Sequence, residues 1–278
     1  MTQWLVNGLP DGSLSPQDRG LAYGDGLFET IALRAGKFRL LDYHLERLQT
    51  GCERLAIPPP AKGLLGAELQ QLAANCANGT AKIIITRGCG PRGYRTPVAT
   101  HATRLVGLFP AVDLSLPAWR DGIRVRWCQT PVAENPLLAG LKTLNRLEQV
   151  LGRAEWQDDT ISEGLMSTLQ GHVIGGTMSN LFMVSGSQLL TPGLSRCGIN
   201  GVMRRLILEV AAELGISTLE QSMDAAQLLA ADEVFLSNCL LGIAPVISLG
   251  DQPLTIGPVS RQMMQALAQR GISECAVA

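Results

Sequence analysis

The 278-residue chain has few of the residues from which metal centres and disulfide frameworks are built. It contains three histidines and seven cysteines, and no two cysteines form a CxxC pair. The cysteine number is odd and the spacing is scattered, which argues against structural disulfides and a thiolate metal site. So few histidines make a histidine-rich metal site equally improbable. We therefore predict no metal, and chemistry that depends on lysine, carboxylates or a bound cofactor.

A strong charge of either sign and long apolar runs are also absent. The 23 basic and 24 acidic residues give a net charge of −1, so nothing indicates a nucleic-acid partner or a charged membrane surface. No apolar run approaches the length of a membrane span. The first residues, MTQWLVNGLPDG, lack the pattern of a signal peptide. With 46% hydrophobic and 17% charged residues, the composition predicts a soluble, globular, cytoplasmic protein.

Alternating apolar residues and turn residues predict short strands and two helices in the first part of the chain. One helix is expected after Asp42, whose side chain suits an N-cap. The triple proline at 58–60 ends it, and a second helix is expected over 64–74. The expected strands are 4–6, 27–33, 37–41, 81–86 and 104–109.

The second half alternates strands with helices. Apolar spacings of three and four predict a helix over 144–156 and an amphipathic helix that follows Asn200 as its N-cap and stops at Gly215. A last helix is expected over 260–268. The expected strands are 123–128, 164–168, 180–184, 216–220 and 233–237. Residues 110–122 resemble a crossing between domains, so we predict an α/β (α+β) protein with a smaller domain at 1–115 and a larger one at 116–278.

Lysine is scarce, which draws attention to Lys142. Only four lysines occur, at 37, 62, 82 and 142, and Lys82 at the start of a strand is expected to point to solvent. Lys142 lies in the apolar stretch LAGLKTL, where desolvation lowers the pKa of a lysine as Schiff-base chemistry requires. The residues alone leave open that Lys142 merely covers the apolar side of its own helix.

A glycine-rich segment, Gly198-Ile199-Asn200-Gly201-Val202-Met203-Arg204, precedes the amphipathic helix. Exposed N–H groups at such a helix start can bind a phosphate, although most helix starts of this kind bind nothing. Its spacing is neither that of a Walker loop nor that of a dinucleotide fingerprint. Arg47 and Asn238 are further candidates for an anion, and Arg47 by itself is equally compatible with a solvated helix residue.

Seven segments, in order along nearly the whole chain, resemble the class IV family of pyridoxal-phosphate enzymes, and within it the aminodeoxychorismate lyases. The most specific is LAGLKTLNRLEQV, which is similar to the cofactor-lysine segment of those lyases. The other six are DRG with YGDGLFET, HLERL, RGCGPRGY, TMSNLF, GINGVMR and the segment from ADE to PV. Each segment alone is weakly specific, but the ordered series is highly specific.

The resemblance implies a fold-type IV enzyme of two domains, similar to D-amino-acid aminotransferase, active as a homodimer with its site near the domain interface. It implies that Lys142 is the Schiff-base lysine of pyridoxal 5'-phosphate and also the general base. Thr30 places a hydroxyl beside that lysine. The implied phosphate and cofactor ligands are Arg47, Gly201, Val202, Met203 and Asn238.

Within the family, three features favour a lyase. They are the NRLEQ sequence after Lys142, the Arg92-Gly93-Tyr94 loop, and Thr30, where lyases tend to carry a hydroxyl beside the lysine. Asn238 with Leu240 is also similar to lyases, since aminotransferases usually place a phosphate-binding threonine at the position of Cys239. The resemblance then implies conversion of 4-amino-4-deoxychorismate to 4-aminobenzoate and pyruvate, a step of folate biosynthesis. Arg92, Tyr94 and Arg95 are candidates to bind the substrate, because arginine offers a bidentate fork to carboxylates.

One position departs from the family. Where relatives carry a glutamate that pairs with the pyridine nitrogen of the cofactor, this chain has Gly175. Three explanations stay open: another carboxylate such as Glu163 or Asp159 serves the nitrogen, the chain is a lyase with weakened catalysis, or it binds the cofactor without turnover. The remaining alternative is a class IV aminotransferase of the D-amino-acid or branched-chain type.

Overall fold

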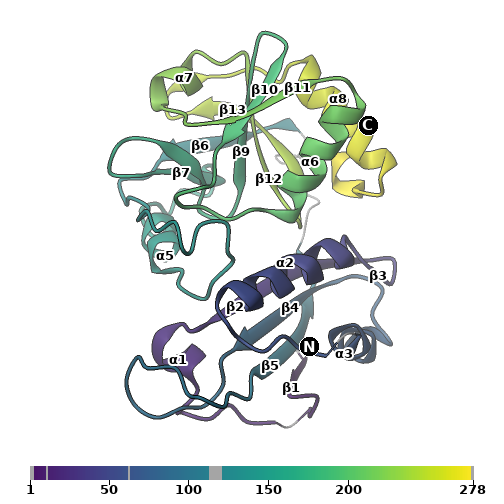
Figure 1. The fold of residues 1–278 in the computed structure, drawn as a ribbon. Helices are drawn as coiled ribbons and strands as arrows, with labels where there is room; N and C mark the ends of the chain where they lie inside the picture. Colours follow the sequence, from purple (N-terminus) through teal and green to yellow (C-terminus); the bar gives the residue numbers. More distant parts are fainter. Residues whose placement is uncertain (1–2, 11, 62, 113–120, 277–278) are drawn as a thin grey trace. The chain divides into compact units, whose positions relative to one another are not determined.

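The structure, a computed structural model, describes residues 3–10, 12–61, 63–112 and 121–276. The chain divides into two compact units (Figure 1). Unit 1 consists of Met1–Val112 and Leu141–Asn145, and unit 2 of Asp113–Gly140 and Arg146–Ala278. The predicted boundary between residues 115 and 116 lies outside the described residues. Strands and helices in both units confirm the predicted α/β class.

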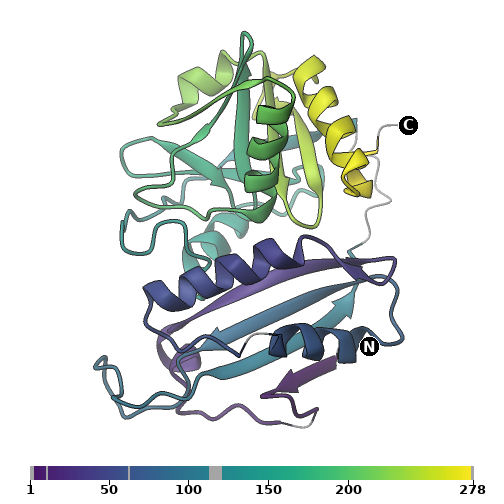
Figure 2. The ribbon, with the colours of Figure 1, turned by 45° about the vertical axis from the view of Figure 1, so that its right-hand side comes forward.

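Unit 1 is built on a five-stranded antiparallel sheet in the order β1-β5-β4-β2-β3. The strands are β1 (Gln3–Val6), β2 (Gly26–Arg34), β3 (Lys37–Phe38), β4 (Gly79–Thr86) and β5 (Thr103–Pro110). Two helices, α2 (Leu41–Arg54) and α3 (Leu64–Ala73), pack on one face of this sheet (Figure 2). A short helix, α1 (Arg19–Tyr23), precedes β2 and ends at Gly24 in the left-handed conformation.

The core of unit 1 follows the two-residue period of its strands. Alternate apolar side chains of β2, β4 and β5 face the helices, where they meet Leu48 and Cys52 of α2 and Leu69 of α3. The intervening residues of β2, Phe28 and Thr30, therefore project from the opposite face of the sheet.

Unit 2 contains a nine-stranded mixed sheet. Six of its strands follow one another in the order β9-β12-β13-β6-β7-β8, and β8 pairs back onto β9, so these six strands close into a ring around an apolar core. The strands are β6 (Ile123–Trp127), β7 (Glu163–Ser167), β8 (Val173–Gly176), β9 (Asn180–Ser185), β10 (Gln188–Pro192), β11 (Ser217–Gln221), β12 (Glu233–Asn238), β13 (Gly242–Leu249) and β14 (Gln252–Pro253).

The helices of unit 2 lie outside this ring, and two of them, α6 and α8, pack against each other and against β12 (Figure 1). They are α5 (Leu147–Arg153), α6 (Val202–Glu213), α7 (Ala225–Leu229), α8 (Pro258–Gln269) and the 3₁₀ helix η1 (Ser273–Cys275). None of the described helices is long and apolar enough to cross a membrane.

Three predicted element starts are wrong. Leu40, in the left-handed conformation, caps α2, so Asp42 falls in the first turn, and the preceding strand is only Lys37–Phe38. Gly201 caps α6, because the side chain of Asn200 accepts from Arg204 instead (3.4 Å). The helix expected over 144–156 begins at Leu147, since the residues just before it are bonded along β2.

Candidate active site

Lys142 lies on a segment of unit 1 that runs alongside β2. The N–H of Phe28 donates to the carbonyl of Lys142 (3.0 Å), and the N–H of Leu144 donates to that of Gly26 (3.0 Å). The side chain is half-buried, and its Nζ lies 4.3 Å from the centre of the Phe28 ring, a cation–π contact. Strand-type hydrogen bonds thus hold the backbone, so the ammonium group is carried by a rigid element, as a catalytic lysine requires.

Two further polar side chains share this face of the sheet. Thr30 follows Phe28 at the two-residue period, and it pairs with Lys82 of β4 in the strand register. Lys82, predicted to point to solvent, is instead half-buried with its Nζ 5.4 Å from the centre of the Phe28 ring. The structure therefore brings Thr30, Lys82 and Lys142 together around Phe28. The sequence did not single out Lys82, because its placement depends on a ring contributed by another strand.

Arg47 belongs to a buried ion-pair cluster on the helix-covered face of β2. Its Nε and Nη2 donate to the two oxygens of Glu29 (2.8 and 2.5 Å), and Nδ1 of His44 lies 2.6 Å from the same carboxylate. Burial alone raises the pKa of Glu29, but the charge of Arg47 and the hydrogen bonds from His44 and Arg47 outweigh it and hold that pKa below its ordinary value. Glu29 therefore stays ionised and fixes the orientation of the Arg47 guanidinium.

The predicted substrate loop is exposed. The side chains of Arg92, Tyr94 and Arg95 all face solvent, with Tyr94 86% exposed. The backbone of the loop, in contrast, is held at Gly93. The guanidinium of Arg19 donates to the carbonyl of Gly93, and the phenol oxygen of Tyr23 accepts from its N–H.

The first turn of α6 in unit 2 is the best candidate for a phosphate site. Its N-cap, Gly201, offers no side-chain acceptor, and the first main-chain bond inside the helix is donated by Arg205. The N–H groups of Val202 and Met203 are therefore left for an anion at the positive end of the helix. Asn180 supports this turn, because its Nδ2 donates to the carbonyl of Ile199 (2.9 Å). A Cβ on Gly201 would lie 2.0 Å from Oδ1 of Asn180, so glycine is required there.

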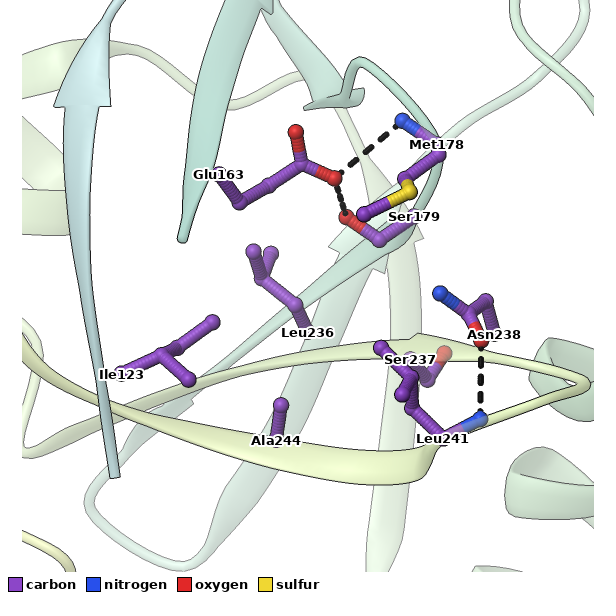
Figure 3. A pocket seen from close by; sticks show the side chains of 9 residues that line it. All are labelled: Ile123, Glu163, Met178, Ser179, Leu236, Ser237, Asn238, Leu241 and Ala244. Carbon is purple, nitrogen blue, oxygen red and sulfur yellow. Dashed lines mark hydrogen bonds between the residues drawn. The ribbon is translucent and has the colours of Figure 1, made fainter. Parts of the chain in front are cut away.

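A pocket in unit 2 combines apolar walls with polar groups (Figure 3). Ser237 lines it with a buried hydroxyl that has no hydrogen-bond partner among the described residues. The Oδ1 of Asn238 accepts from the N–H groups of Leu240 and Leu241 (3.0 and 2.9 Å), which turns the amide nitrogen away from them, as Figure 3 shows. Since a buried unpaired hydroxyl costs about 1–3 kcal/mol, these groups suit a polar ligand atom.

Glu163 also lines this pocket, but its carboxylate is already engaged. Oε1 accepts from the N–H of Gly164 (3.0 Å) and from the N–H and hydroxyl of Thr177 (3.1 and 2.5 Å). Oε2 accepts from the N–H of Met178 (3.2 Å) and the hydroxyl of Ser179 (2.9 Å). With both oxygens occupied, we infer that Glu163 fixes the turn at 177–179 and has no capacity left for a ring nitrogen. Asp159, the other carboxylate predicted as an alternative partner of the ring nitrogen, lies exposed in a turn.

Gly175 lies in β8, paired with Met166 of β7 and Asn180 of β9. A Cβ at this position would lie 2.7 Å from the carbonyl oxygen of Ser179, so any side chain requires a small backbone shift. Each unit by itself thus offers groups that fit pyridoxal phosphate: unit 1 a lysine, and unit 2 an uncapped helix start and a pocket with a hydroxyl that is unpaired among the described residues. They do not supply the carboxylate that the family resemblance implies for the pyridine nitrogen.

Comparisons with known proteins agree with this geometry. The Amino-transferase class IV family matches residues 26–249. An aminodeoxychorismate lyase of Vibrio harveyi is 39% identical over 248 residues, 87% of this chain and 89% of the relative. The crystal structure of 4-amino-4-deoxychorismate lyase from Pseudomonas aeruginosa superposes with a TM-score of 0.93 at 45% identity, covering 97% of this chain and 99% of that one.

A hypothetical aminotransferase of Mycobacterium tuberculosis, solved in a PLP-bound form, has the same fold. Its TM-score is 0.79 at 22% identity, covering 99% of this chain and 100% of that one. This likeness shows the fold alone.

Proposed function

Since the chain belongs to the class IV aminotransferase family, we propose that it is a pyridoxal-phosphate-dependent lyase that converts 4-amino-4-deoxychorismate to 4-aminobenzoate and pyruvate. The observation that carries this proposal is the likeness, over almost the whole chain, to proteins named as that lyase. The aminotransferase alternative is less favoured, because the lyases are more similar to this chain than the aminotransferase compared above. The activity places the protein in the formation of 4-aminobenzoate for folate.

Pyridoxal phosphate, when bound, supplies an electron sink for the carbon that bears the substrate amine. Lys142 would hold the cofactor through its side-chain amine, and the same amine would serve as the general base that removes the proton from that carbon. The carbon–oxygen bond to the enolpyruvyl group then breaks, the ring becomes aromatic, and the leaving enolpyruvate gains a proton to give pyruvate. No oxidant and no amino acceptor is consumed. Thr30, on the same face of β2 as Phe28, supplies a hydroxyl that orients the amine of Lys142.

The substrate carries two carboxylates, and unit 1 offers three cations for them. Arg92 and Arg95 lie in the exposed loop, and Lys82 lies over Phe28 with Lys142. No ion pair that involves Lys82, Arg92 or Arg95 is found among the described residues. We assign carboxylate binding to these three side chains and to Tyr94 of the loop, because cations without an anionic partner among the described residues are available to a substrate.

The distinguishing experiment is amino-acceptor dependence. The purified protein, saturated with pyridoxal phosphate, receives aminodeoxychorismate with and without a 2-oxo acid, and separately D-alanine or a branched-chain amino acid with a 2-oxo acid. A lyase forms aromatic product at the same rate with or without the acceptor. Product formation only from the amino acids would replace the lyase with an aminotransferase.

We assign the phosphate of the cofactor to Gly201, Val202 and Met203, with Arg47 and Asn238. Replacing Gly201 with alanine is expected to raise the dissociation constant of pyridoxal phosphate at least about tenfold, because the added Cβ displaces Asn180 from the turn that presents the N–H groups. Equilibrium titration of the apoprotein measures it. Gly193→Ala is the matched control, since its Cβ meets nothing closer than 4.0 Å. Equal affinities in the two variants would contradict the assignment.

We also propose that the protein is a cytoplasmic homodimer. All seven cysteines are free, which suits a reducing compartment, and cell fractionation tests this. The helix α5 exposes Leu147 (76%), Val150 and Leu151 (59% each), a surface that favours a second copy of the chain. Light scattering after size-exclusion chromatography is expected to give twice the chain mass of 29.7 kDa. The chain mass itself would contradict the dimer.

A further inference from the structure

Tyr23, the last residue of α1, contacts the segment that carries Lys142. Its carbonyl accepts from Nδ2 of Asn145 (3.4 Å), three residues after the lysine. The next residue, Gly24, lies so close to this amide that a Cβ there would be 2.5 Å from the same nitrogen. The backbone at the end of α1 is therefore in direct contact with the lysine segment within unit 1.

The side chain of Tyr23 reaches in another direction, to the loop at 92–95. Its phenol oxygen accepts from the N–H of Gly93 (3.0 Å). Its ring meets that of Tyr94 edge-on, with 5.4 Å between the ring centres and 60° between the planes. One residue thus contacts both the lysine segment, through its carbonyl, and the loop, through its phenol.

Arg19 completes the attachment of the loop. Its Nη1 and Nη2 donate to the carbonyls of Gly93 (2.9 Å) and Tyr94 (3.3 Å), and its guanidinium lies 4.9 Å from the centre of the Tyr23 ring. Both main-chain polar groups of Gly93 are therefore bonded, one by Tyr23 and one by Arg19.

Asp25 holds Arg19 in place. It accepts from Nε of Arg19 (2.9 Å) and, on the same oxygen, from Nε of Arg87 (2.8 Å). Burial alone raises the pKa of Asp25. The hydrogen bonds and charges of Arg87 and Arg19 lower it by more than burial raises it, so this pKa lies below its ordinary value. The carboxylate is therefore charged at neutral pH, and its ion pair with Arg19 holds the guanidinium against the ring of Tyr23.

We propose that Tyr23 is a positioning residue that fixes the backbone of the Arg92-Gly93-Tyr94-Arg95 loop, and thereby sets the affinity for the carboxylates of the substrate. This inference rests on the proposed function, in which that loop binds the substrate. The exposed side chains of Arg92 and Arg95 make no ion pair among the described residues, so the backbone anchor at Gly93 governs their position.

Tyr23→Phe tests the inference, because it removes the phenol oxygen and keeps the ring against Tyr94. Losing one hydrogen bond to the Gly93 N–H is expected to raise KM for aminodeoxychorismate about fivefold, with kcat changed less than about twofold. The dissociation constant of chorismate, a dicarboxylate without the amine, should rise by the same factor in calorimetry. Hydrogen exchange at the Gly93 amide should accelerate, and the absorption spectrum of the bound cofactor should stay unchanged. Thr50→Val, which removes an exposed hydroxyl of α2, is the control.

Unchanged KM and unchanged chorismate affinity in Tyr23→Phe would overturn the inference, even if exchange at Gly93 accelerates. If the unmodified protein forms no 4-aminobenzoate, the proposed function fails, and the chorismate titration alone decides the role of Tyr23. Absence of chorismate binding by the unmodified protein would overturn both.

Discussion

Replacing Lys142 with alanine is expected to abolish the visible absorption band of covalently attached pyridoxal phosphate and to lower kcat by more than about a thousandfold. The variant loses the covalent attachment point and the general base together, and a positioned base alone contributes about 10²–10⁴-fold. The side chain projects from a segment held by main-chain bonds to Phe28 and Gly26, so its removal should leave unit 1 folded. Absorption spectra and steady-state kinetics measure the two effects.

Two other lysines serve as controls for this experiment. Lys37, exposed in β3, should be replaceable by alanine with no change in either measurement. Lys82 shares the Phe28 ring with Lys142, so Lys82→Ala tests which of the two ammonium groups carries the cofactor. We expect Lys82→Ala to keep the absorption band and to raise KM. An absorption band that survives in Lys142→Ala and vanishes in Lys82→Ala would show that the lysine is wrongly assigned.

Replacing Gly175 with glutamate is expected to raise kcat/KM at least about tenfold over the matched Gly175→Gln variant. A carboxylate at this place keeps the pyridine nitrogen protonated, and a charge-assisted hydrogen bond contributes roughly 1.5–3 kcal/mol, or about ten- to a hundredfold in rate. Both variants carry the same Cβ, which meets the carbonyl of Ser179, so the backbone shift cancels between them. The difference therefore isolates the negative charge.

The ratio between the two variants also decides among the three explanations for Gly175. A rise in activity with glutamate only, from a nearly inactive parent, identifies a lyase with weakened catalysis. Equal activity in both variants would mean that another group serves the ring nitrogen, against our inference that Glu163 is fully engaged by the 177–179 turn. No activity in either variant, with cofactor bound, would support a binding protein without turnover.

The first half of the fold was largely predictable because its strands have the regular pattern of one buried face. Alternation over 27–33, 81–86 and 104–109 matches β2, β4 and β5, and the helix at 64–74 matches α3 within a residue. These elements combine β-branched and aliphatic residues with a clear two-residue or helical period, so local pattern and tertiary burial agree.

The closed ring of unit 2 was predictable only in part. The sequence indicated four strands of the ring, β6, β7, β9 and β12, but the other two were missed: β8 contains two glycines, and β13 contains Pro245. Both residue types are depleted in strands, and these segments form strands because neighbours distant in sequence pair with them. The ring closes where Gly175 of β8 pairs with Asn180 of β9, and no pattern in the sequence around these two residues predicts this pairing.

The candidate site divides in the same way. Lys142 and the helix start at Gly201 could be named from their segments, because an apolar lysine stretch and a glycine-rich helix start carry local signals. Lys82, Tyr23 and Ser237 carry no such local signal. Lys82 and Tyr23 are brought to notice by contacts with residues distant in the sequence, and Ser237 by a hydroxyl that is buried without a hydrogen-bond partner among the described residues.

Release of 4-aminobenzoate and pyruvate from aminodeoxychorismate by the unmodified protein, saturated with pyridoxal phosphate and without any amino acceptor, tests the central claim most directly. We expect the two products in equal amounts, at a rate that Lys142→Ala reduces to background and that Lys37→Ala leaves unchanged. Bound cofactor with no aromatic product in the unmodified protein would contradict the account.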